Sequence, residues 1–312
     1  MSNKMATRDA YGMALAEFAE QYDLYVFDAD LAAATKTGTL KAAYPDRFFD
    51  CGIAEGNMMG VAAGMAAAGK TVFASSFAMF AAGRAYEQVR NSIGYPHLNV
   101  KIGATHAGIS VGEDGATHQC NEDIALMRTI PGMVILNPAD PVEARAAVKA
   151  AIEHNGPVYL RFGRMAVDTI FDDNYAFEIG KGIVLEDGAD VTIVATGLMV
   201  AEAIKAHKML ADKGISAAII NMPTIKPVDK DLLVEYSKKT GAIVTSEEHS
   251  IIGGLGGAVC EAIAEEAPCV VVRHGVNDVF GKSGPALKVL DEFGLNAENI
   301  VKCAEKAISL KK

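Results

Sequence analysis

The chain has 312 residues, a formal net charge of -10 and 50% hydrophobic residues, a composition typical of a globular protein rather than a disordered one. This length allows two domains, because a single hydrophobic core usually stops growing near about 250 to 300 residues. The acidic balance and the lack of any Lys/Arg cluster argue against nucleic acid as a partner, since a phosphate backbone is bound by a basic face.

The cysteines and the apolar segments indicate a soluble, cytoplasmic protein. The five cysteines are odd in number and form no CxxC pair, which is typical of reduced thiols rather than of a disulfide framework. The polar start of the chain lacks the apolar core of a signal peptide. The most apolar stretch begins at Met58 and is broken by glycines, and it is well short of the roughly 20 residues that span a bilayer.

Strand-like and helix-like segments alternate along the first half of the chain. The strand candidates are apolar, β-branched runs that begin at Leu24, Thr71, Asn99, Met133 and Pro157. The helix candidates are alanine-rich stretches near residues 54–69, 78–93, 121–129 and 140–154. Continuous apolar strands separated by helices indicate a parallel sheet that is covered on both faces.

The same alternation restarts after an acidic, glycine-containing interruption over residues 166–189, which we expect to link two domains. Further strand candidates begin at Val191, Ser216, Gly241 and Pro268, with helical stretches near 198–213, 229–239 and 254–266. Two amphipathic helices, beginning at Pro285 and Ala297, close the chain. The sequence therefore predicts two consecutive three-layer α/β domains with mainly parallel sheets, over residues 1–165 and 190–312.

The segment "GEDGATHQ", residues 112–119, follows the third predicted strand, and His106 lies at the carboxyl end of that strand. Open parallel sheets bind ligands at this edge. The glycines and Asp114 suit a solvated turn, whereas His106, His118 and Asp114 together would form a proton-transfer cluster. A metal site is a third interpretation, which the absence of HxH and HExxH spacing does not favour.

Glu55 opens a helix that otherwise consists almost entirely of Ala, Gly, Met and Val, and we expect that helix to be buried nearly all round. The carboxylate could simply favour the helix dipole, or it could be a functional group with a perturbed proton affinity. Phe77 and Phe80 are three residues apart, which suits either a core position or a platform for a flat heteroaromatic ring.

Two further patterns concern phosphate binding. Of the nine arginines, only Arg273 lies beyond residue 165, which favours an anionic ligand on the first half of the chain. The stretch "IIGGLGGAV", residues 251–259, has neither a GxGxxG register nor a GK[ST] ending, so we expect its glycines to allow close packing of a helix on a strand.

Five segments carry a resemblance to a known family: "DADLAAAT", "CGIAEGNMMGVAAGMAAAG", "SSFAMFAAGRAYEQVR", "THAGISVGEDGATHQ" and "YLRFGR", in this order. With them, essentially the whole chain resembles the C-terminal half of transketolase. "GEDGATHQ" after "THAGIS" is specific to transketolases, whereas the Glu55 and Phe77 regions are shared with 1-deoxyxylulose-5-phosphate synthase and with the β subunits of 2-oxo acid dehydrogenases. The resemblance implies a pyrimidine-binding domain followed by a transketolase C-terminal domain, and a catalytic loop.

The resemblance also implies a binding site for thiamine diphosphate. Glu55 matches the glutamate that hydrogen-bonds the pyrimidine ring of this cofactor, and Phe77 and Phe80 match the aromatic pocket around the ring. A third aromatic residue of the family is replaced here by Gly83. That replacement leaves either Tyr86 as a substitute or a more open pocket.

Two residue pairs at the edge of this site are less specific. Asp30 and Leu31 match residues at the subunit interface near the cofactor, with packing as an equal alternative. A phosphate-binding serine that the family carries near Ala34 is missing, and Thr35 and Thr37 are the candidates to replace it.

The substrate end of the site follows from the same resemblance. His106 and His118 match histidines that line the substrate channel, hydrogen-bond sugar hydroxyls and help to move protons. Asp114 matches an aspartate that recognises a sugar hydroxyl, and Arg164 matches an arginine that holds the sugar phosphate. The implied reaction is transfer of a two-carbon ketol unit from a ketose phosphate to an aldose phosphate.

One expected feature is missing from the sequence. Thiamine diphosphate enzymes hold the diphosphate and Mg²⁺ on a domain with a Gly-Asp-Gly motif and a downstream Asn, and no such pair occurs here. The resemblance therefore implies a partner subunit with that domain and the Mg²⁺ ligands, in an α₂β₂ tetramer or a looser assembly. Two alternatives stay open: a subunit of a 1-deoxyxylulose-5-phosphate synthase, and a non-catalytic subunit that only orders its partner.

Overall fold

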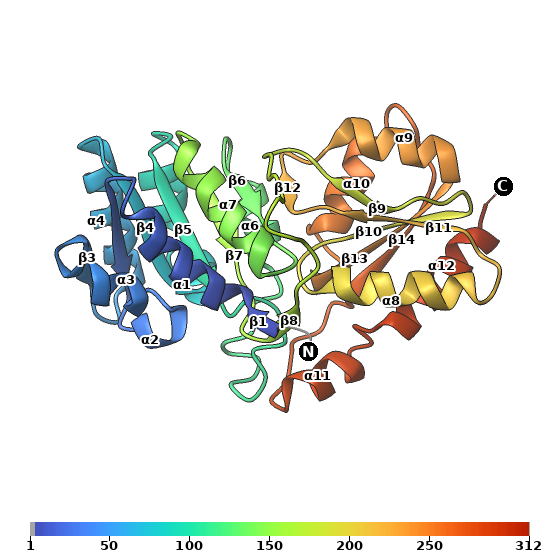
Figure 1. The fold of residues 1–312 in the computed structure, drawn as a ribbon, viewed down its shortest axis with the longest axis horizontal. Helices are drawn as coiled ribbons and strands as arrows, with labels where there is room; N and C mark the ends of the chain where they lie inside the picture. The colour runs from blue at the N-terminus through green and yellow to red at the C-terminus, as the bar shows by residue number, and fades with distance from the viewer. Residues whose placement is uncertain (1–3, 312) are drawn as a thin grey trace.

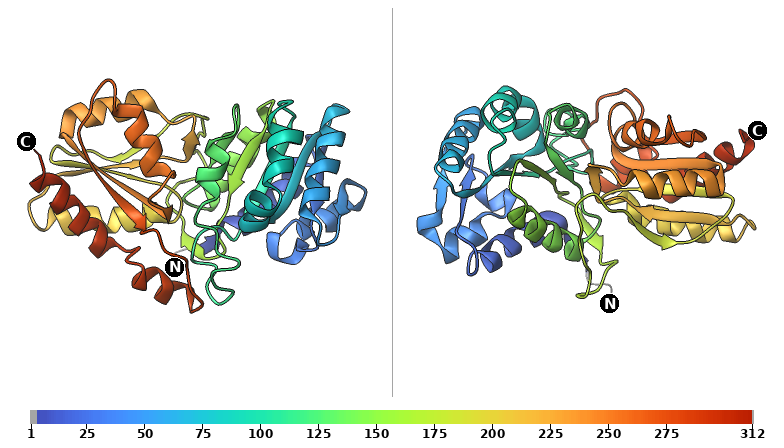
Figure 2. Two further views of the ribbon diagram at one scale, coloured as in Figure 1. Left: turned by 180° about the vertical axis from the view of Figure 1, so that it is seen from behind. Right: turned by 90° about the horizontal axis from the view of Figure 1, so that it is seen from above.

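A computed structural model describes residues 4–311 of the protein. Figure 1 shows two α/β domains side by side, with the C-terminal end of the chain at the outer edge of the second domain. Helices cover both faces of each sheet, as the view from above in Figure 2 shows. The predicted fold class is confirmed: both sheets are mainly parallel.

The first sheet has the strand order β12-β6-β7-β5-β4-β2-β3 in the described part of the chain. Its strands are parallel except for β12, which pairs antiparallel with β6. The bounds are β2 (Leu24–Asp28), β3 (Phe48–Asp50), β4 (Thr71–Phe77), β5 (Val100–Thr105), β6 (Val134–Leu136), β7 (Val158–Arg161) and β12 (Thr224–Lys226).

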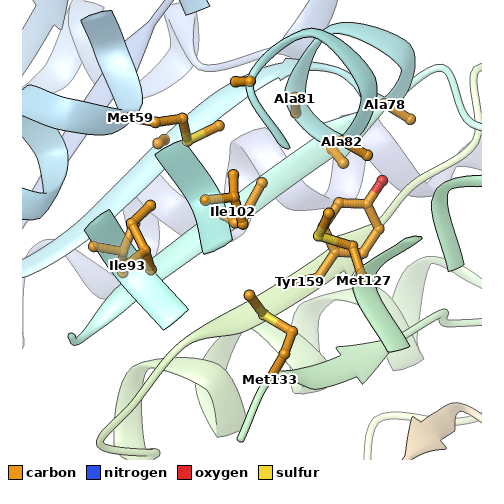
Figure 3. Close-up of a cluster of buried hydrophobic side chains, with 14 of the residues drawn as sticks. Met59, Ala78, Ala81, Ala82, Ile93, Ile102, Met127, Met133 and Tyr159 are labelled. Atoms are coloured by element: carbon orange, nitrogen blue, oxygen red, sulfur yellow. The ribbon is translucent and has the colours of Figure 1, made fainter. Parts of the chain in front are cut away.

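Two hydrophobic clusters sandwich this sheet, one on each face. One face carries α1 (Thr7–Phe18), α3 (Gly38–Ala43) and α7 (Pro141–Glu153), and the short segments α2 (Ala32–Thr35) and η1 (Pro45–Arg47) connect β2 to β3. The other carries α4 (Glu55–Ala67), the π-helical segments η2 (Met79–Arg84) and η3 (Val89–Gly94), α5 (Tyr86–Gln88) and α6 (Asp123–Arg128). Figure 3 shows this second face, where Met59, Ala82 and Met127 pack around Ile102 and Tyr159 of the sheet.

The expectation that the Glu55 helix is buried nearly all round was wrong for this chain. Met58, Met59 and Ala62 of α4 are buried against the sheet. Val61 is 45% exposed, and a Cβ added at Gly60 or Gly64 would meet nothing within 4 Å. One face of α4 is therefore exposed to solvent, because the glycines on that face carry no side chains.

The second sheet has the order β14-β13-β10-β11-β9 in the described residues, and only β9 runs antiparallel to its neighbour. Its strands are β9 (Ile183–Glu186), β10 (Val191–Ala195), β11 (Ala217–Asn221), β13 (Ala242–Ser250) and β14 (Val270–Val276). Its helices are α8 (Met199–Ala211) and α12 (Ala297–Ser309) on one face, α9 (Lys230–Thr240) and α10 (Leu255–Ile263) on the other, and α11 (Ala286–Glu292) beyond the sheet edge. Strands β1 (Lys4–Ala6) and β8 (Ala166–Asp168) form an antiparallel ribbon at the domain junction.

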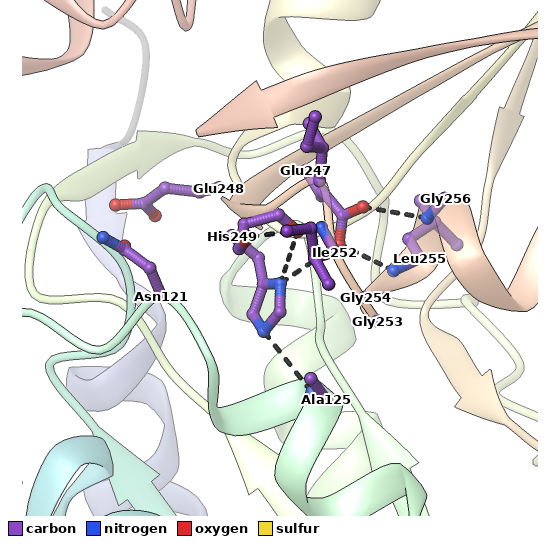
Figure 4. Close-up of polar contacts among 12 residues, drawn as sticks. Asn121, Ala125, Glu247, Glu248, His249, Ile252, Gly253, Gly254, Leu255 and Gly256 are labelled. Atoms are coloured by element: carbon purple, nitrogen blue, oxygen red, sulfur yellow. Dashed lines mark hydrogen bonds and ion pairs between the residues drawn. The ribbon is translucent and has the colours of Figure 1, made fainter. Parts of the chain in front are cut away.

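Polar side chains at the end of β13 hold the two domains together (Figure 4). Glu248 accepts a hydrogen bond from the backbone N–H of Ser110, at 2.6 Å, in the loop that follows β5. Glu247 accepts from the N–H groups of Leu255 and Gly256 at 2.6 and 2.8 Å, and so satisfies donors at the start of α10. The second domain thereby anchors the loop that leads to "GEDGATHQ".

Two glycines of the 251–259 stretch, Gly254 and Gly256, lie where helix α10 meets strand residues, whereas Gly253 and Gly257 face Ala125 and Arg128 of α6. A Cβ at Gly254 would lie 2.0 Å from Glu247 Oε2, and one at Gly256 would lie 2.9 Å from Thr245 Oγ1. These contacts fit the expected close packing of a helix on a strand.

Candidate active site

The carboxyl ends of β2, β4 and β5 meet at one edge of the first sheet. Phe77 is the last residue of β4, and His106 directly follows β5. Glu55 is the first residue of α4, so its carboxylate lies at a helix N-terminus, where the peptide dipoles favour negative charge. Three chain segments that are far apart in the sequence thus bring their polar and aromatic side chains to one place.

Glu55 forms an ion pair with Arg84. The Nη1 atom of Arg84 donates to both carboxylate oxygens of Glu55, at 3.0 Å each. The Glu55 side chain is 2% exposed and the Arg84 side chain 52%. A buried carboxylate without a partner is strongly destabilising, and Arg84 supplies that partner.

An aromatic stack continues from this ion pair into the sheet edge. The guanidinium carbon of Arg84 lies 4.4 Å from the centroid of the Phe80 ring. Phe80 stacks on Phe77 at 5.9 Å between centroids, and Phe77 stacks on the imidazole of His106 at 3.8 Å. His118 meets Phe80 edge-on at 5.3 Å. The four rings of Phe77, Phe80, His106 and His118 therefore pack together at this edge of the sheet.

An open cavity of about 390 Å³ lies at the outer end of the stack, and its lining includes Asp30, Leu31, Glu55, Phe80, Arg84 and His118. Five of the residues that the sequence predicted for the site therefore border one cavity. Phe77 and His106 lie behind them, only 8% and 3% exposed, and they support the cavity wall through the stack rather than line it.

His106 is held neutral by its surroundings. Arg8 Nη1 lies 2.8 Å from His106 Nε2, and Thr105 Oγ1 lies 2.9 Å from Nδ1. Since a guanidinium can only donate, Nε2 is the acceptor and Nδ1 carries the proton. Burial, followed by the charges of Arg8 and Arg164, lowers the pKa of His106 to about 3. His106 is therefore set up as a neutral imidazole.

The segment 112–119 forms a loop, and Arg164 contacts this loop and the residue before it. Arg164 Nη1 donates to the carbonyl oxygen of Val111 and lies 3.5 Å from Glu113 Oε2 and 3.7 Å from Asp114 Oδ2. On the other side, Gln119 donates to the carbonyl oxygen of Lys282, at 3.0 Å, in the second domain. Asp114 and Arg164 thus form one pair at the rim, outside the cavity that Glu55 borders.

Thr35 and Thr37 are already engaged inside the protein. Both hydroxyls donate to Oδ2 of Asp28, at 2.7 and 2.9 Å, and both side chains are fully buried. They satisfy a buried carboxylate whose pKa burial raises. Neither hydroxyl is therefore available in this structure to replace the missing serine. The sequence could not show this, because the contact of both hydroxyls with Asp28 depends on the fold.

Tyr86 does not fill the place of the third aromatic residue. Its hydroxyl lies 2.9 Å from Thr129 Oγ1, and its ring packs against the core cluster under α6. The cavity is flanked instead by Arg84, which lies over Phe80. A side chain at Gly83 would collide with Met79 at 2.1 Å from its methyl carbon.

His249 lies near the end of β13, where its sequence context suits a ligand contact or, at least as well, a structural role, and it is fully buried at the domain junction. It accepts from the N–H of Ala125 at 3.4 Å through Nε2 and contacts the carbonyl oxygen of Ser250 through Nδ1, at 2.7 Å (Figure 4). These contacts support the structural role.

Two arginines of the site were not singled out in the sequence. Arg8 contacts His106, and Arg84 contacts Glu55. Both belong to the arginine-rich first half of the chain, which was the available signal, but their partners lie 98 and 29 residues away. Within residues 4–311, no group of three or more His, Cys, Asp or Glu side chains is arranged to hold a metal ion.

Two family models match the chain: the transketolase pyrimidine-binding domain over residues 3–169 and the transketolase C-terminal domain over residues 180–300. The chain belongs to the transketolase family. The resemblance inferred from the five motif segments is thereby confirmed. In the described residues, no helix has the length and apolar character needed to cross a membrane.

Curated relatives of matching length support this assignment to the transketolase family. A protein of Methanocaldococcus jannaschii described as a transketolase C-terminal section is 50% identical over 95% of this chain and 94% of its own length. A 6-deoxy-6-sulfo-D-fructose transketolase subunit of a Clostridium species is 43% identical over 97% of this chain and 95% of its own. One of the subunits of an apulose-4-phosphate transketolase, from Phocaeicola vulgatus, is 38% identical, with 97% of each chain covered.

Solved transketolase structures share the fold. A split-gene transketolase, described as an inactive β₄ tetramer, is 53% identical with a TM-score of 0.93, over 99% of this chain and 100% of that one. The transketolase of Leishmania mexicana is 25% identical with a TM-score of 0.85, and this chain covers 46% of it. The chain thus covers the full length of the split-gene transketolase chain and about half of the Leishmania mexicana transketolase chain.

Proposed function

We propose that this chain is one subunit of a two-subunit transketolase, which transfers a two-carbon ketol group from a ketose phosphate to an aldose phosphate. The observation that carries the proposal is the buried carboxylate of Glu55 at the wall of an open cavity, beside the face of Phe80. A carboxyl group and a heterocyclic nitrogen that share one proton hydrogen-bond strongly where water is excluded, and an aromatic face packs well on a flat ring.

The residues of the cavity fit the pyrimidine end of thiamine diphosphate. Glu55 would hydrogen-bond the ring nitrogen, Phe80 would pack against the ring, and Asp30 and Leu31 would also border it. When bound, thiamine diphosphate supplies the carbanion stabilisation that breaking the ketose C–C bond requires. We place the diphosphate and Mg²⁺ ligands on a partner subunit, since the models matching this chain cover pyrimidine-binding and C-terminal domains.

The sugar would enter past the imidazoles and end at the arginines. His118 lines the cavity and can donate or accept a hydrogen bond with a sugar hydroxyl, and Asp114 can accept one. His106 would reach a sugar hydroxyl only if Arg8 released its Nε2 atom. Burial lowers the pKa of Arg8, and the positive charge of Arg164 lowers it further. The two guanidinium groups therefore lie close to each other. Two guanidinium groups beside His106 suit the phosphate of the substrate.

The identity of the sugar is the specific hypothesis to test, because related subunits are named for 6-deoxy-6-sulfo-D-fructose and apulose 4-phosphate. The test combines this chain with a partner subunit that carries the diphosphate domain, and measures transfer from xylulose 5-phosphate to ribose 5-phosphate. Activity of the partner alone would indicate a non-catalytic role for this chain. Turnover of pyruvate with an aldehyde acceptor would indicate a 1-deoxyxylulose-5-phosphate synthase.

The role of Glu55 gives the first prediction. Glu55→Ala should lower the rate of transfer by roughly a hundredfold or more, in the range that acid–base groups contribute. The matched control is Glu87→Ala, since Glu87 is an exposed carboxylate that contacts only Gln88 and Asn91 in the described structure. Full activity of a correctly assembled Glu55→Ala complex would rule out the assignment.

A further inference from the structure

Arg84 occupies an unusual position in the helical layer. It is the last residue of the π-helical segment η2, and the wide turn is closed by a hydrogen bond from the N–H of Ala85 to the carbonyl oxygen of Phe80, at 3.1 Å. Wide turns of this kind occur frequently at functional sites. Here the turn directs the Arg84 guanidinium over the Phe80 ring and onto Glu55 at the same time.

Among residues 4–311, Arg84 is the one group that hydrogen-bonds the Glu55 carboxylate. It does so with a single nitrogen, which occupies one acceptor position on each oxygen. A carboxylate offers about four acceptor positions in all. Roughly two therefore remain, and Glu55 can receive a second donor from the cavity while Arg84 stays bound.

The burial of the two partners is asymmetric. Glu55 is 2% exposed, whereas the Arg84 side chain is 52% exposed and reaches the cavity opening. The ion pair therefore fixes the orientation of a buried carboxylate from the solvent side.

We infer that Arg84 is a positioning residue that acts through Glu55, holding its carboxylate oriented toward the pyrimidine nitrogen of the cofactor, from which it accepts a hydrogen bond when that nitrogen carries a proton. This inference rests on the proposed function and names a residue beyond the expected site. Without Arg84, the Glu55 side chain would be free to rotate out of that orientation.

The test measures cofactor affinity rather than turnover. The complete two-subunit enzyme is titrated calorimetrically, in the presence of Mg²⁺, with thiamine diphosphate and with an analogue in which C–H replaces the pyrimidine nitrogen N1′. The variants are Arg84→Met, which removes the charge, and Arg84→Lys, which keeps it. Arg90→Met is the matched control, because Arg90 is exposed and contacts only the neighbouring Asn91 in the described residues.

Arg84→Met should weaken thiamine diphosphate binding by roughly tenfold, the effect of one charge-assisted hydrogen bond lost at a half-exposed site. Affinity for the N1′-lacking analogue should stay within about twofold, because the analogue has no nitrogen for Glu55 to contact. Arg84→Lys should restore part of the affinity, and Arg90→Met should change neither titration.

Either of two results would overturn the inference. An equal loss for cofactor and analogue would mean that Arg84 contacts the cofactor directly or merely shapes the cavity. Tighter binding by Arg84→Met would mean that Arg84 blocks Glu55. If Arg84→Met does not fold, the same comparison is made between Glu55→Gln and Glu55→Gln/Arg84→Met. The ratio of the affinity for thiamine diphosphate to the affinity for the analogue must then be the same in both variants, because neither has the Glu55 carboxylate for Arg84 to orient. Failure of the unaltered enzyme to bind thiamine diphosphate would instead refute the proposed function, and this inference with it.

Discussion

His106 shows how strongly the fold can change a single residue. As an isolated side chain its pKa is 6.5, and in the protein, burial together with Arg8 and Arg164 lowers the pKa to about 3. Because the unfolded chain takes up a proton on His106 near pH 6.5 and the folded chain does not, acid favours unfolding. Stability from this group is complete above about pH 6.5 and is lost as the pH falls toward 3.

This linkage gives a prediction. Between about pH 6.5 and pH 4.5, His106 should lower the free energy of unfolding by up to about 1.4 kcal/mol per pH unit. His106→Asn removes the titration, so the acid limb of a denaturation series should become shallower by that amount. In an NMR titration of the intact chain, the His106 ring signals should not move between pH 5 and 8. A midpoint near 6.5 would contradict the neutral imidazole.

Single residues also mark the limit of sequence prediction at the site. Asp30, Leu31, Glu55, Phe80 and His118 belong to recognisable motifs and border one cavity. Arg8 and Arg84 belong to no motif that indicates a partner, because their contacts depend on how α1 and η2 pack. The environment of Thr35 and Thr37 was equally invisible until the fold placed Asp28 beside them.

At the scale of elements, helix α1 packs so closely on β5 that only a glycine fits at position 103. A Cβ there would lie 2.1 Å from the Tyr11 hydroxyl and 2.9 Å from Ser75 Oγ, and those two hydroxyls are hydrogen-bonded to each other at 2.6 Å. Gly64 on the open face of α4 is the opposite case, with nothing within 4 Å of an added Cβ.

Alanine substitutions at these two glycines should therefore have opposite effects. Gly103→Ala should destabilise the chain by about 2–4 kcal/mol, through overpacking and loss of the Tyr11–Ser75 hydrogen bond. Gly64→Ala should stabilise the isolated chain by about 0.5–1 kcal/mol, because alanine favours an exposed helix. Chemical denaturation of both variants checks the pair, and similar values for the two would contradict the packing described for β5.

Elements with a long apolar run were predictable from the sequence, and short edge elements were not. Strands β2, β5, β10 and β11 lie within the predicted runs, and β4 begins at the predicted Thr71 but continues past its predicted run to Phe77. A buried parallel strand needs continuous apolar residues. Strands β3, β9 and β12 have three or four residues each, too few to show a period. The stretch 78–93 was predicted as helical, but its composition did not indicate the wide turns of η2 and η3.

At the scale of the whole molecule, the two domains share parts of their cores. Strand β12 comes from the second half of the chain but extends the first sheet. Ile225 of β12 and Ala258 of α10 both belong to the hydrophobic cluster of the first domain. Pairing of this kind links residues more than 80 positions apart, as between Leu136 and Thr224, so no local pattern in the sequence could predict it.

Arg161 is a buried polar link between the domains. Its guanidinium donates to both oxygens of Asp123, at 2.8 and 3.2 Å, and to the backbone carbonyl of Glu248, at 2.9 Å, in the second domain. Burial alone would raise the pKa of Asp123, but Arg161 holds that pKa below its usual range. Both side chains are almost completely buried, so water cannot replace either partner.

Arg161→Met should therefore lower the free energy of unfolding by about 3–5 kcal/mol, the usual cost of leaving one member of a buried ion pair without its partner. It should also loosen the domain junction, so that calorimetry shows two thermal transitions where the native chain shows one. The matched control is Arg145→Met, which breaks the exposed pair with Glu17 and should cost at most about 1 kcal/mol. Equal costs for the two variants, with one transition in each, would mean that the shared apolar core alone couples the domains.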